Sequence, residues 1–257
     1  MKLSKNLKIG ITGSQGFIGG HIAVVLKNQG VKLSFFDLPK NDLLKPGKNL
    51  ENFIKDKDAI FHTAAVNRGT DTEIIVGSVV STYNLISAIE KLKKRPKLIF
   101  LSSIQAETET LYGKSKRLAE IMLEDFSKKN KIPVVIFRLT NVFGEGCKPF
   151  YNSVVATFCY QAANGKELTV NPESRNKKIN LIYVKNVASE IVKEISCRRN
   201  NNFYLKNINS KNEISIGDLA KLIQSFKNQQ KLKSLLAGKQ GKFYKDLYKT
   251  YLSYVEK

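Results

Sequence analysis

Short apolar runs alternate with longer amphipathic stretches along the first half of this 257-residue chain. Five runs are almost continuously apolar and rich in β-branched residues, which is typical of strands buried on both faces. They cover residues 7–12, 32–36, 59–62, 97–102 and 134–139. Three intervening stretches, at 16–29, 71–93 and 112–130, have the periodicity of amphipathic helices. Because such an alternation builds a parallel sheet covered on both faces, the pattern predicts an α/β, doubly wound parallel sheet of the Rossmann type.

The second half of the chain has a different pattern, punctuated by Gly, Pro and Asn. It predicts helices over 152–165 and 185–196, short strands between them, and a loop or frayed helix over the polar stretch 224–242. We expect a smaller C-terminal substrate-binding lobe, placed near the carboxyl ends of the strands, where such sheets bind ligands. The predicted divisions are 1–145 for the Rossmann domain and 146–257 for the lobe, with 179–196 returning to the Rossmann domain.

The composition indicates a sizeable core and a strongly basic surface. Hydrophobic residues make up 42% of the chain, and its formal net charge is +21. A basic footprint can mark a nucleic-acid-binding protein. Here, however, the lysines are scattered along the whole chain and no nucleic-acid motif accompanies them. We therefore interpret them as solvated surface charge, which would also attract an anionic small substrate, and we predict no nucleic-acid partner.

The sequence carries no signal for membrane insertion or secretion. No apolar run approaches the roughly 20 residues that span a bilayer, and the N-terminus enters the first strand without the apolar core of a signal peptide. The three cysteines, Cys147, Cys159 and Cys197, form no C-x-x-C pair and are too few for a disulfide framework. We predict a cytoplasmic protein with reduced thiols, no membrane partner and no metal site.

A glycine-rich turn, TGSQGFIGG, follows the first predicted strand and opens the first predicted helix. Glycine permits a tight turn at Gly13, close approach of the backbone to phosphates at Gly16, and packing of helix on sheet at Gly19. The helix N-terminus then presents free N–H groups to a pyrophosphate. The turn thus predicts a dinucleotide site. Its predicted contacts are Gly13, Gln15, Gly16, Phe17, Ile18 and Gly19.

An acidic residue, Asp37, ends the second predicted strand. Its carboxylate can accept hydrogen bonds from the adenosine ribose and would repel a 2′-phosphate, which favours NAD over NADP. Lys40 lies close by and could instead serve a phosphate, so NADP stays open. Asp42 and Leu43 could reach the adenine, although Asp42 could also cap the following turn.

Tyr112 and Lys116 are four residues apart in YGKSK, so a helix would place them on one face. An adjacent ammonium lowers the pKa of a phenol from its usual value near ~10 and makes it a usable acid near neutrality. Ser103, preferred over Ser102, ends the preceding strand and could donate a hydrogen bond to a carbonyl under reduction. Y-x-x-x-K alone is common on solvated helices. Beside the glycine turn, it predicts a catalytic set of Ser103, Tyr112 and Lys116.

Together, T-G-x-x-G-x-x-G, the strand ending in serines and YGKSK resemble the extended short-chain dehydrogenase/reductase family of NAD(P)-dependent nucleotide-sugar enzymes, the NAD-dependent epimerase/dehydratase family. Four further segments are similar to the reductase half of capsule-synthesis enzymes of the CapF type, and the similarity covers nearly the whole chain. They are HTAAVNRG, SSIQA, RLTNVFGEGCKPFYNSVVATFC and LYKTYLSY. The resemblance implies reduction of the 4-keto group of a UDP-linked amino-deoxy sugar, a UDP-2-acetamido-2,6-dideoxy-hexulose.

The resemblance also implies roles for individual residues. Tyr112 would protonate the developing alkoxide, and Lys116 would hold the nicotinamide ribose. Further cofactor contacts would be Ala64, Ala65 and Leu139. Substrate contacts would be Asn67, Arg68, Ser103, Asn141, Tyr151, Asn152 and Ser153. From the residues alone, Asn67 and Arg68 could form a surface turn, and the last three could be a helix N-cap with its flank. A homodimer through helices 71–93 and 112–130 is implied as well.

The chain departs from the CapF type in three places. Enzymes of that type carry a C-terminal metal-binding cupin domain used for C3 epimerisation, and this sequence ends where that domain would begin. We therefore expect reductase chemistry only. Ser78 replaces an Asn common in the family, which would alter a proton-relay water, and Asn186 replaces an Asp, with an expected effect on structure alone.

Three alternative functions differ in their chemistry. A 4,6-dehydratase would need an Asp-Glu pair where Ile104 and Gln105 stand, and neither side chain transfers protons. A C4 epimerase, which retains its cofactor, stays open; Cys147 is disfavoured as its acid because no histidine partners it. A dinucleotide-binding protein without turnover is the remaining alternative, although the presence of all three catalytic residue types disfavours it.

Overall fold

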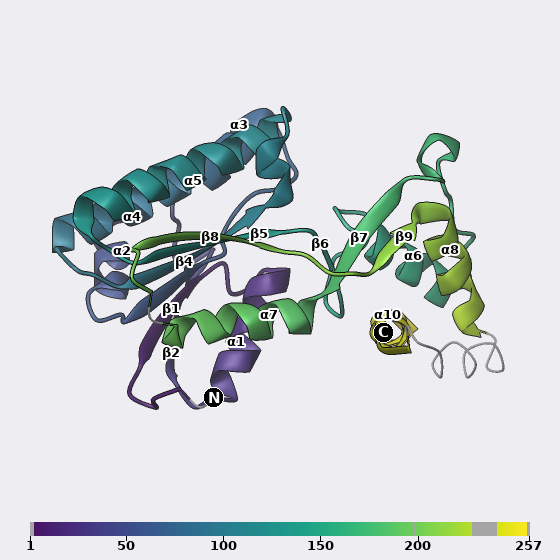
Figure 1. Ribbon diagram of the computed structural model, residues 1–257, viewed down its shortest axis with the longest axis horizontal. Helices are drawn as coiled ribbons and strands as arrows, with labels where there is room; N and C mark the ends of the chain where they lie inside the picture. Colours follow the sequence, from purple (N-terminus) through teal and green to yellow (C-terminus); the bar gives the residue numbers. More distant parts are fainter. Residues whose placement is uncertain (1–2, 198, 228–240, 256–257) are drawn as a thin grey trace. The chain divides into compact units, whose positions relative to one another are not determined.

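A computed structural model of the chain describes residues 3–197, 199–227 and 241–255 (Figure 1). The chain divides into two compact units. The first unit comprises Met1–Leu139 and Ala188–Ile208, and the second comprises Thr140–Val187 and Asn209–Lys257. The sequence had placed the division between 145 and 146 and the returning segment at 179–196; the compact units change at 139/140 and return over 188–208.

The first unit is built on a six-stranded, wholly parallel sheet in the order β2-β1-β3-β4-β5-β8. The strands are β1 (Lys8–Thr12), β2 (Lys32–Phe36), β3 (Ala59–His62), β4 (Lys97–Ser103), β5 (Val134–Leu139) and β8 (Phe203–Ile208). The five predicted strands all form, with ends within one residue of prediction, and the predicted doubly wound fold is confirmed. The edge strand β8 was not predicted.

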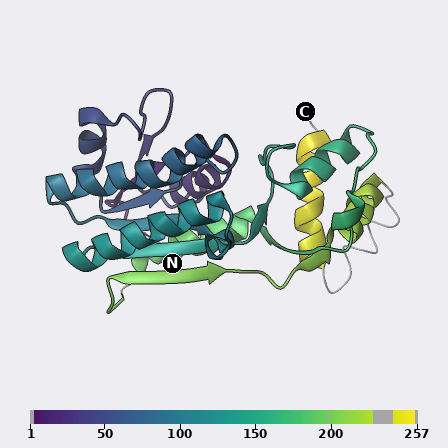
Figure 2. The same cartoon turned by 90° about the horizontal axis from the view of Figure 1, so that it is seen from above.

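Helices cover both faces of this sheet (Figure 1). α1 (Phe17–Lys27) and α7 (Val184–Lys193) lie on one face. On the other lie α3 (Asp71–Ile75), α4 (Ser81–Leu92) and α5 (Leu111–Asn130), and Figure 2 shows α4 and α5 side by side. A short helix, α2 (Gly47–Ile54), precedes β3. The core on this side of the sheet includes Leu85, Phe100, Leu123 and Ile136, each at most 1% exposed.

The helix predicted over 71–93 is interrupted by a π-helical turn, Val76–Val80, between α3 and α4. At Gly77 a Cβ would come within 2.5 Å of Val66, so the backbones approach closely there. Two hydroxyls bond back to the turn: Ser81 donates to the Gly77 carbonyl and Thr82 to the Ser78 carbonyl, both at 2.7 Å. Such back-bonding competes with regular α-helical pairing and explains a local change of register.

By length and composition, the 22-residue helical run Asp71–Leu92 is long and apolar enough to cross a membrane. The expectation that no apolar run approaches that length is therefore wrong. Its inner face contributes Leu85, Ile86 and Ile89 to the core over the sheet. Because a helix that packs on a core passes the same test, the run is weak support for a membrane span.

The second unit contains a three-stranded sheet and three described helices. β7 (Lys178–Tyr183) pairs in parallel with β6 (Asn141–Phe143) and antiparallel with β9 (Glu213–Ser215). The helices are α6 (Val154–Ala163), α8 (Ile216–Gln224) and α10 (Gly241–Val255). α10 packs on α6, with the Tyr160 and Tyr254 rings 6.2 Å apart. Of the polar stretch predicted as a loop or frayed helix, residues 228–240 lie outside the described part of the chain.

Candidate active site

The glycine-rich turn between β1 and α1 packs closely against the residues that follow β3. Gly13 has a φ of +78°, and a Cβ there would lie 2.6 Å from the Ala64 backbone nitrogen. A Cβ at Gly19 would overlap the Gly13 carbonyl oxygen and lie 2.6 Å from Thr63 Oγ1. At Gly16 a Cβ would meet only the Gly13 oxygen, at 3.2 Å. Gly13 and Gly19 thus hold the turn against the sheet, while Gly16 leaves its outer side open.

The N-terminus of α1 is suited to an anion. Its N-cap, Gly16, has no side chain to bond the free N–H groups, and the first turn, at Phe17 and Ile18, contains no acidic residue. Free N–H groups and the positive end of the helix dipole therefore face outward, as a pyrophosphate requires.

Asp37 lies beside this turn at the end of β2. It accepts a 2.5 Å hydrogen bond from Ser14 Oγ, and the Gln15 side-chain amide donates to the Leu38 carbonyl at 3.3 Å. Gln15 and Ser14 thus tie the turn to the segment after β2. Since Ser14 occupies only one carboxylate oxygen in these bonds, Asp37 keeps acceptor capacity for a ribose hydroxyl.

The residues that follow Asp37 have structural roles. Asp42 accepts a 2.8 Å hydrogen bond from the Leu44 backbone N–H, which is the turn cap considered as its alternative. Leu43 is 8% exposed and packs in the core of the sheet, so its side chain is engaged there. Ala64 and Ala65 follow β3, and the Ala64 backbone lies directly against Gly13. Leu139, 5% exposed, ends β5 opposite Ser103.

The end of β4 and the start of α5 bring Ser103 and Tyr112 into one region. Ser103 caps a 3₁₀ turn, Ile104–Glu107, by accepting from the Gln105 N–H at 3.1 Å. Thr110 caps α5 by accepting from the Gly113 N–H at 3.1 Å. A Cβ at Gly113 would overlap the Gln105 carbonyl, so glycine lets α5 press against the 3₁₀ turn. The sequence YG therefore places Tyr112 at the end of the strand that carries Ser103.

Lys116 is buried beneath Tyr112 on the same helix. It is 3% exposed, donates to the Leu101 carbonyl at 3.2 Å, and lies 4.9 Å from the centre of the Phe100 ring. Burial lowers the pKa of Lys116 to about 8, and the Glu120 carboxylate opposes that shift. A lysine with this pKa is still largely an ammonium at neutral pH, as stabilisation of a phenolate requires.

A buried histidine, His62, shares this pocket of the core. Its Nδ1 lies 2.8 Å from Thr12 Oγ1, and its Nε2 lies 3.1 Å from Thr82 Oγ1. Burial, with the positive charge of Lys116, lowers the pKa of His62 to about 3. A neutral His62 with both ring nitrogens partnered positions β1, β3 and α4 and does not serve as an acid. His62 was not among the functional residues predicted from the sequence.

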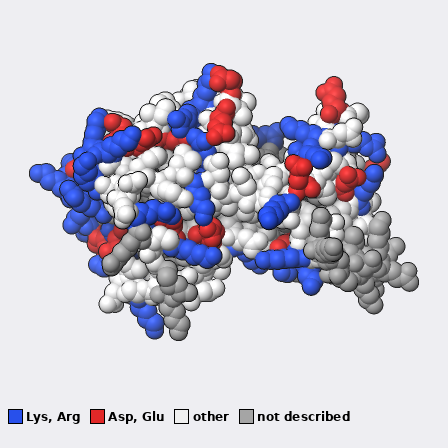
Figure 3. Space-filling view, viewed as in Figure 1, with Lys and Arg blue, Asp and Glu red and all other residues white. Residues whose placement is uncertain are grey.

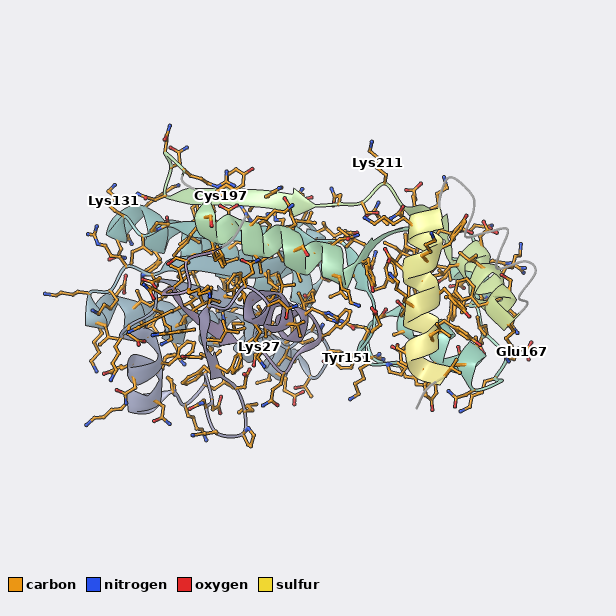
Figure 4. All side chains as sticks on the ribbon, turned by 90° about the horizontal axis from the view of Figure 1, so that it is seen from below. Lys27, Lys131, Tyr151, Glu167, Cys197 and Lys211 are labelled. Carbon is orange, nitrogen blue, oxygen red and sulfur yellow. The ribbon has the colours of Figure 1, made fainter. Side chains whose placement is uncertain are left out.

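The predicted substrate contacts fall on both units. Asn67 and Arg68 are exposed in the segment after β3 of the first unit. In the second unit, Asn141 Nδ2 donates to the Asn180 carbonyl at 3.2 Å, and Ser153 is the N-cap of α6, accepting from the Ala156 N–H at 3.3 Å. Tyr151, labelled in Figure 4, and the exposed Asn152 precede that helix. The cap alternative therefore holds for Ser153.

Among the described residues, no group of three His, Cys, Asp or Glu side chains could hold a metal ion. Cys147 and Cys159 are buried and Cys197 is exposed, and all three are free thiols. Burial raises the pKa of the Cys147 thiol. A thiol with a raised pKa is a poor source of thiolate, which weakens Cys147 further as a reactive group.

The chain matches a model of the NAD dependent epimerase/dehydratase family over residues 9–204, which is more than half of its length. It belongs to that family. The predicted family resemblance is thereby confirmed. The match spans the glycine turn, the three predicted catalytic residues and β5, and it ends at the start of β8.

Individual members of the NAD dependent epimerase/dehydratase family resemble the chain over most of its length. It is 35% identical, over 97% of its residues, to UDP-2-acetamido-2,6-beta-L-arabino-hexul-4-ose reductase of Pseudomonas aeruginosa. The crystal structure of the capsular polysaccharide assembling protein CapF from Staphylococcus aureus matches 97% of it, with 30% identity and a TM-score of 0.77. The chain spans 65% of the length of each of these two proteins.

A third protein matches over its whole length. UDP-N-acetylglucosamine 4-epimerase from Methanobrevibacter ruminantium, solved with UDP-N-acetylmuramic acid, is covered at 99% by 100% of this chain, with a TM-score of 0.83 and 22% identity. At that identity the likeness shows the fold, including the second unit.

Proposed function

We propose that the chain reduces the C4 keto group of a UDP-2-acetamido-2,6-dideoxy-hexulose with NADH. The proposal rests on the position of Ser103, Tyr112 and Lys116 near the carboxyl end of β4, the same end of the parallel sheet at which the glycine turn follows β1. It is supported by the 35% identity of the chain to a UDP-sugar 4-keto reductase. Lys and Arg outnumber Asp and Glu over the visible face of the first unit, which suits an anionic nucleotide sugar (Figure 3).

The residues of the chain fit a dinucleotide and a keto sugar. When bound, the reduced nicotinamide supplies the hydride for C4. Ser103 Oγ donates a hydrogen bond to the C4 oxygen, and Tyr112 gives that oxygen its proton, so that the ketone becomes an alcohol. Lys116, as an ammonium, stabilises the phenolate that Tyr112 becomes, and the phenolate takes a proton from solvent before the next turnover.

The proposal is tested by mixing the protein with a UDP-linked 4-keto amino sugar and NADH and following nicotinamide oxidation. A reductase consumes one NADH for each sugar reduced. A C4 epimerase interconverts sugars with no net change in NADH, and a dinucleotide-binding protein without turnover changes neither. Either of these two outcomes overturns the proposed function.

We further propose a preference for NADH, which rests on the Asp37 carboxylate. Asp37→Asn keeps an acceptor for Ser14 but removes the charge that repels a 2′-phosphate. We expect the ratio of kcat/KM with NADPH to kcat/KM with NADH to rise at least about tenfold, because removal of one charge repulsion is worth about 1.4 kcal/mol or more. The matched control is Asp42→Asn at the nearby turn cap; an equal rise there would contradict a specific role for Asp37.

We also propose a homodimer formed by α4 and α5. Their outer surfaces expose apolar side chains, with Tyr83, Leu118 and Ile121 between 46% and 57% exposed. The double substitution Leu118→Glu and Ile121→Glu puts two charges on that surface, and we expect sedimentation to show a monomer where the parent protein is a dimer. Val24→Glu changes an equally exposed residue on α1, on the opposite face of the sheet, and should leave the dimer intact. A monomeric parent protein would refute this part of the proposal.

A further inference from the structure

A buried carboxylate, Glu120, lies one turn after Lys116 on α5. It is 1% exposed and accepts four hydrogen bonds from three side chains. Ser102 Oγ donates to Oε1 at 2.6 Å, Arg117 donates to Oε2 at 3.0 Å, and Arg138 donates to both oxygens, at 2.8 and 2.7 Å. Because every acceptor position is used, the carboxylate is stable as an anion in the interior.

These bonds join the two elements that carry the predicted catalytic residues, β4 and α5, to the neighbouring strand β5. Ser102 lies in β4, directly before Ser103; Arg138 lies opposite Ser102 in β5; and Glu120 lies in α5. Arg138 is 7% exposed, and its third guanidinium nitrogen, Nη1, donates to Glu107 in the 3₁₀ turn. A two-pronged Arg–carboxylate pair has a fixed geometry, so it sets the height of α5 over the ends of β4 and β5.

The same arrangement fixes the surroundings of Lys116. Lys116 Nζ bonds the carbonyl of Leu101, the residue before Ser102, while Glu120 lies four residues later on the helix. Residues at this spacing share a helix face. The strand end that receives the Lys116 ammonium is therefore anchored to the helix by Glu120.

We propose that Glu120, held by Arg138 and Ser102, is a positioning residue for the reduction: it fixes the end of β4 against α5 and supplies the negative charge that keeps Lys116 an ammonium. The inference rests on the proposed function. It adds two charged residues, Glu120 and Arg138, that the motif of Ser, Tyr and Lys does not include.

The charges around Lys116 support this role. From β3, His62 is neutral, because burial and the charge of Lys116 lower its pKa to about 3. From α5 itself come Tyr112 and Glu120. Arg138 of β5 and Arg117 of α5 both pair with Glu120, and Glu107 pairs with Arg138. Glu120 is thus the negative group beside a lysine whose pKa burial lowers to about 8.

Glu120→Gln tests the inference because it keeps the shape and removes the charge. Without the carboxylate the ammonium is less stable, so the pKa of Lys116 falls. We expect the alkaline limb of kcat/KM, which reports groups of the free enzyme, to lie about one pH unit lower than in the parent enzyme. Since Glu120→Gln leaves the Arg138 guanidinium with one carboxylate partner, Glu107, in place of two, the double variant Glu120→Gln with Arg138→Gln is made as well. Its limb should lie between those of the parent and the single variant.

A second readout does not depend on turnover. The titration of Lys116 is followed by the ¹³Cε shift in protein labelled with ¹³C-lysine, with the signal identified by its loss in Lys116→Met. We expect the midpoint of the Lys116 titration to be highest in the parent protein, lower in the double variant and lowest in Glu120→Gln. The matched control is Glu124→Gln, one turn further along α5, where the carboxylate pairs with the exposed Lys128 at 2.7 Å; it should leave both readouts unchanged.

The two readouts separate failure of this inference from failure of the proposed function. An unchanged Lys116 midpoint in the Glu120 variants overturns the inference, whether or not the enzyme turns over the keto sugar. A lowered midpoint in a protein that does not oxidise NADH supports the electrostatic role and overturns the reductase proposal alone.

Discussion

Tyr112→Phe is expected to lower kcat by about 10²- to 10⁴-fold, the usual contribution of a positioned general acid. Phenylalanine keeps the ring and removes only the hydroxyl that gives its proton to the C4 oxygen. Tyr112 is partly exposed at the first turn of α5, so the loss of one oxygen should leave the fold unchanged. The measurement is NADH oxidation at saturating keto sugar, together with a fluorescence titration of NADH binding.

Unchanged NADH affinity with lost turnover is the signature of a group that acts in the chemical step. Tyr83→Phe provides the control, because it removes the same oxygen from an exposed tyrosine on the neighbouring α4. Its rate should equal that of the parent. If Tyr112→Phe keeps most of the parent rate, a different group protonates the sugar, and the assignment of Tyr112 is wrong.

The strands of the first unit could be predicted because they are buried on both faces, which makes each a short continuous apolar run. β8 escaped prediction for the opposite reason. As an edge strand it pairs only with β5, and its residues FYLKNI are mostly half-exposed, with Lys206 and Asn207 among them. A strand that is only partly buried does not need a continuous run of apolar residues, so its sequence gives little sign of a strand.

Local backbone geometry was also predictable where one residue type alone satisfies it. The roles expected for Gly13 and Gly19 agree with the crowding that a Cβ would meet at each. The π-helical turn at Val76–Val80 was not predictable, because the hydroxyls that bond back to it, Ser81 and Thr82, also occur in regular helices, and Gly77 lies there against Val66 of a different segment. Periodicity describes one helix at a time and contains no information on such a contact.

Side chains that act through long-range pairing were the hardest to predict. In the sequence, Glu120 lies in a predicted amphipathic helix and Arg138 in a predicted buried strand, and only the pairing of β4 with β5 under α5 shows that the two side chains meet. Leu43 shows the converse difficulty, because a leucine after Asp37 suits an adenine contact as well as the core in which it lies. Motifs predicted the candidate reacting groups, whereas the residues that we propose to position them could be found only from the fold.

Gly19→Ala is expected to weaken NADH binding by about 10- to 100-fold and to destabilise the protein by about 1–3 kcal/mol. The added methyl group would overlap the Gly13 carbonyl and come within 2.6 Å of Thr63 Oγ1, so either the turn or α1 must shift. Overpacking of this kind costs the stated energy. A displaced turn also misaligns the N–H groups for the pyrophosphate, and each lost charge-assisted hydrogen bond is worth about 1.5–3 kcal/mol.

The adjacent glycine supplies the control. A Cβ at Gly20 would meet only the Ser14 carbonyl oxygen, at 3.4 Å, which is an ordinary contact. Gly20→Ala should therefore bind NADH as the parent does and gain up to about 1 kcal/mol, since alanine favours a helix over glycine. Binding is measured by fluorescence titration and stability by denaturant unfolding. The two variants differ in that only the alanine at position 19 collides with Gly13. Equal NADH affinities for the two would therefore mean that the turn does not hold the cofactor.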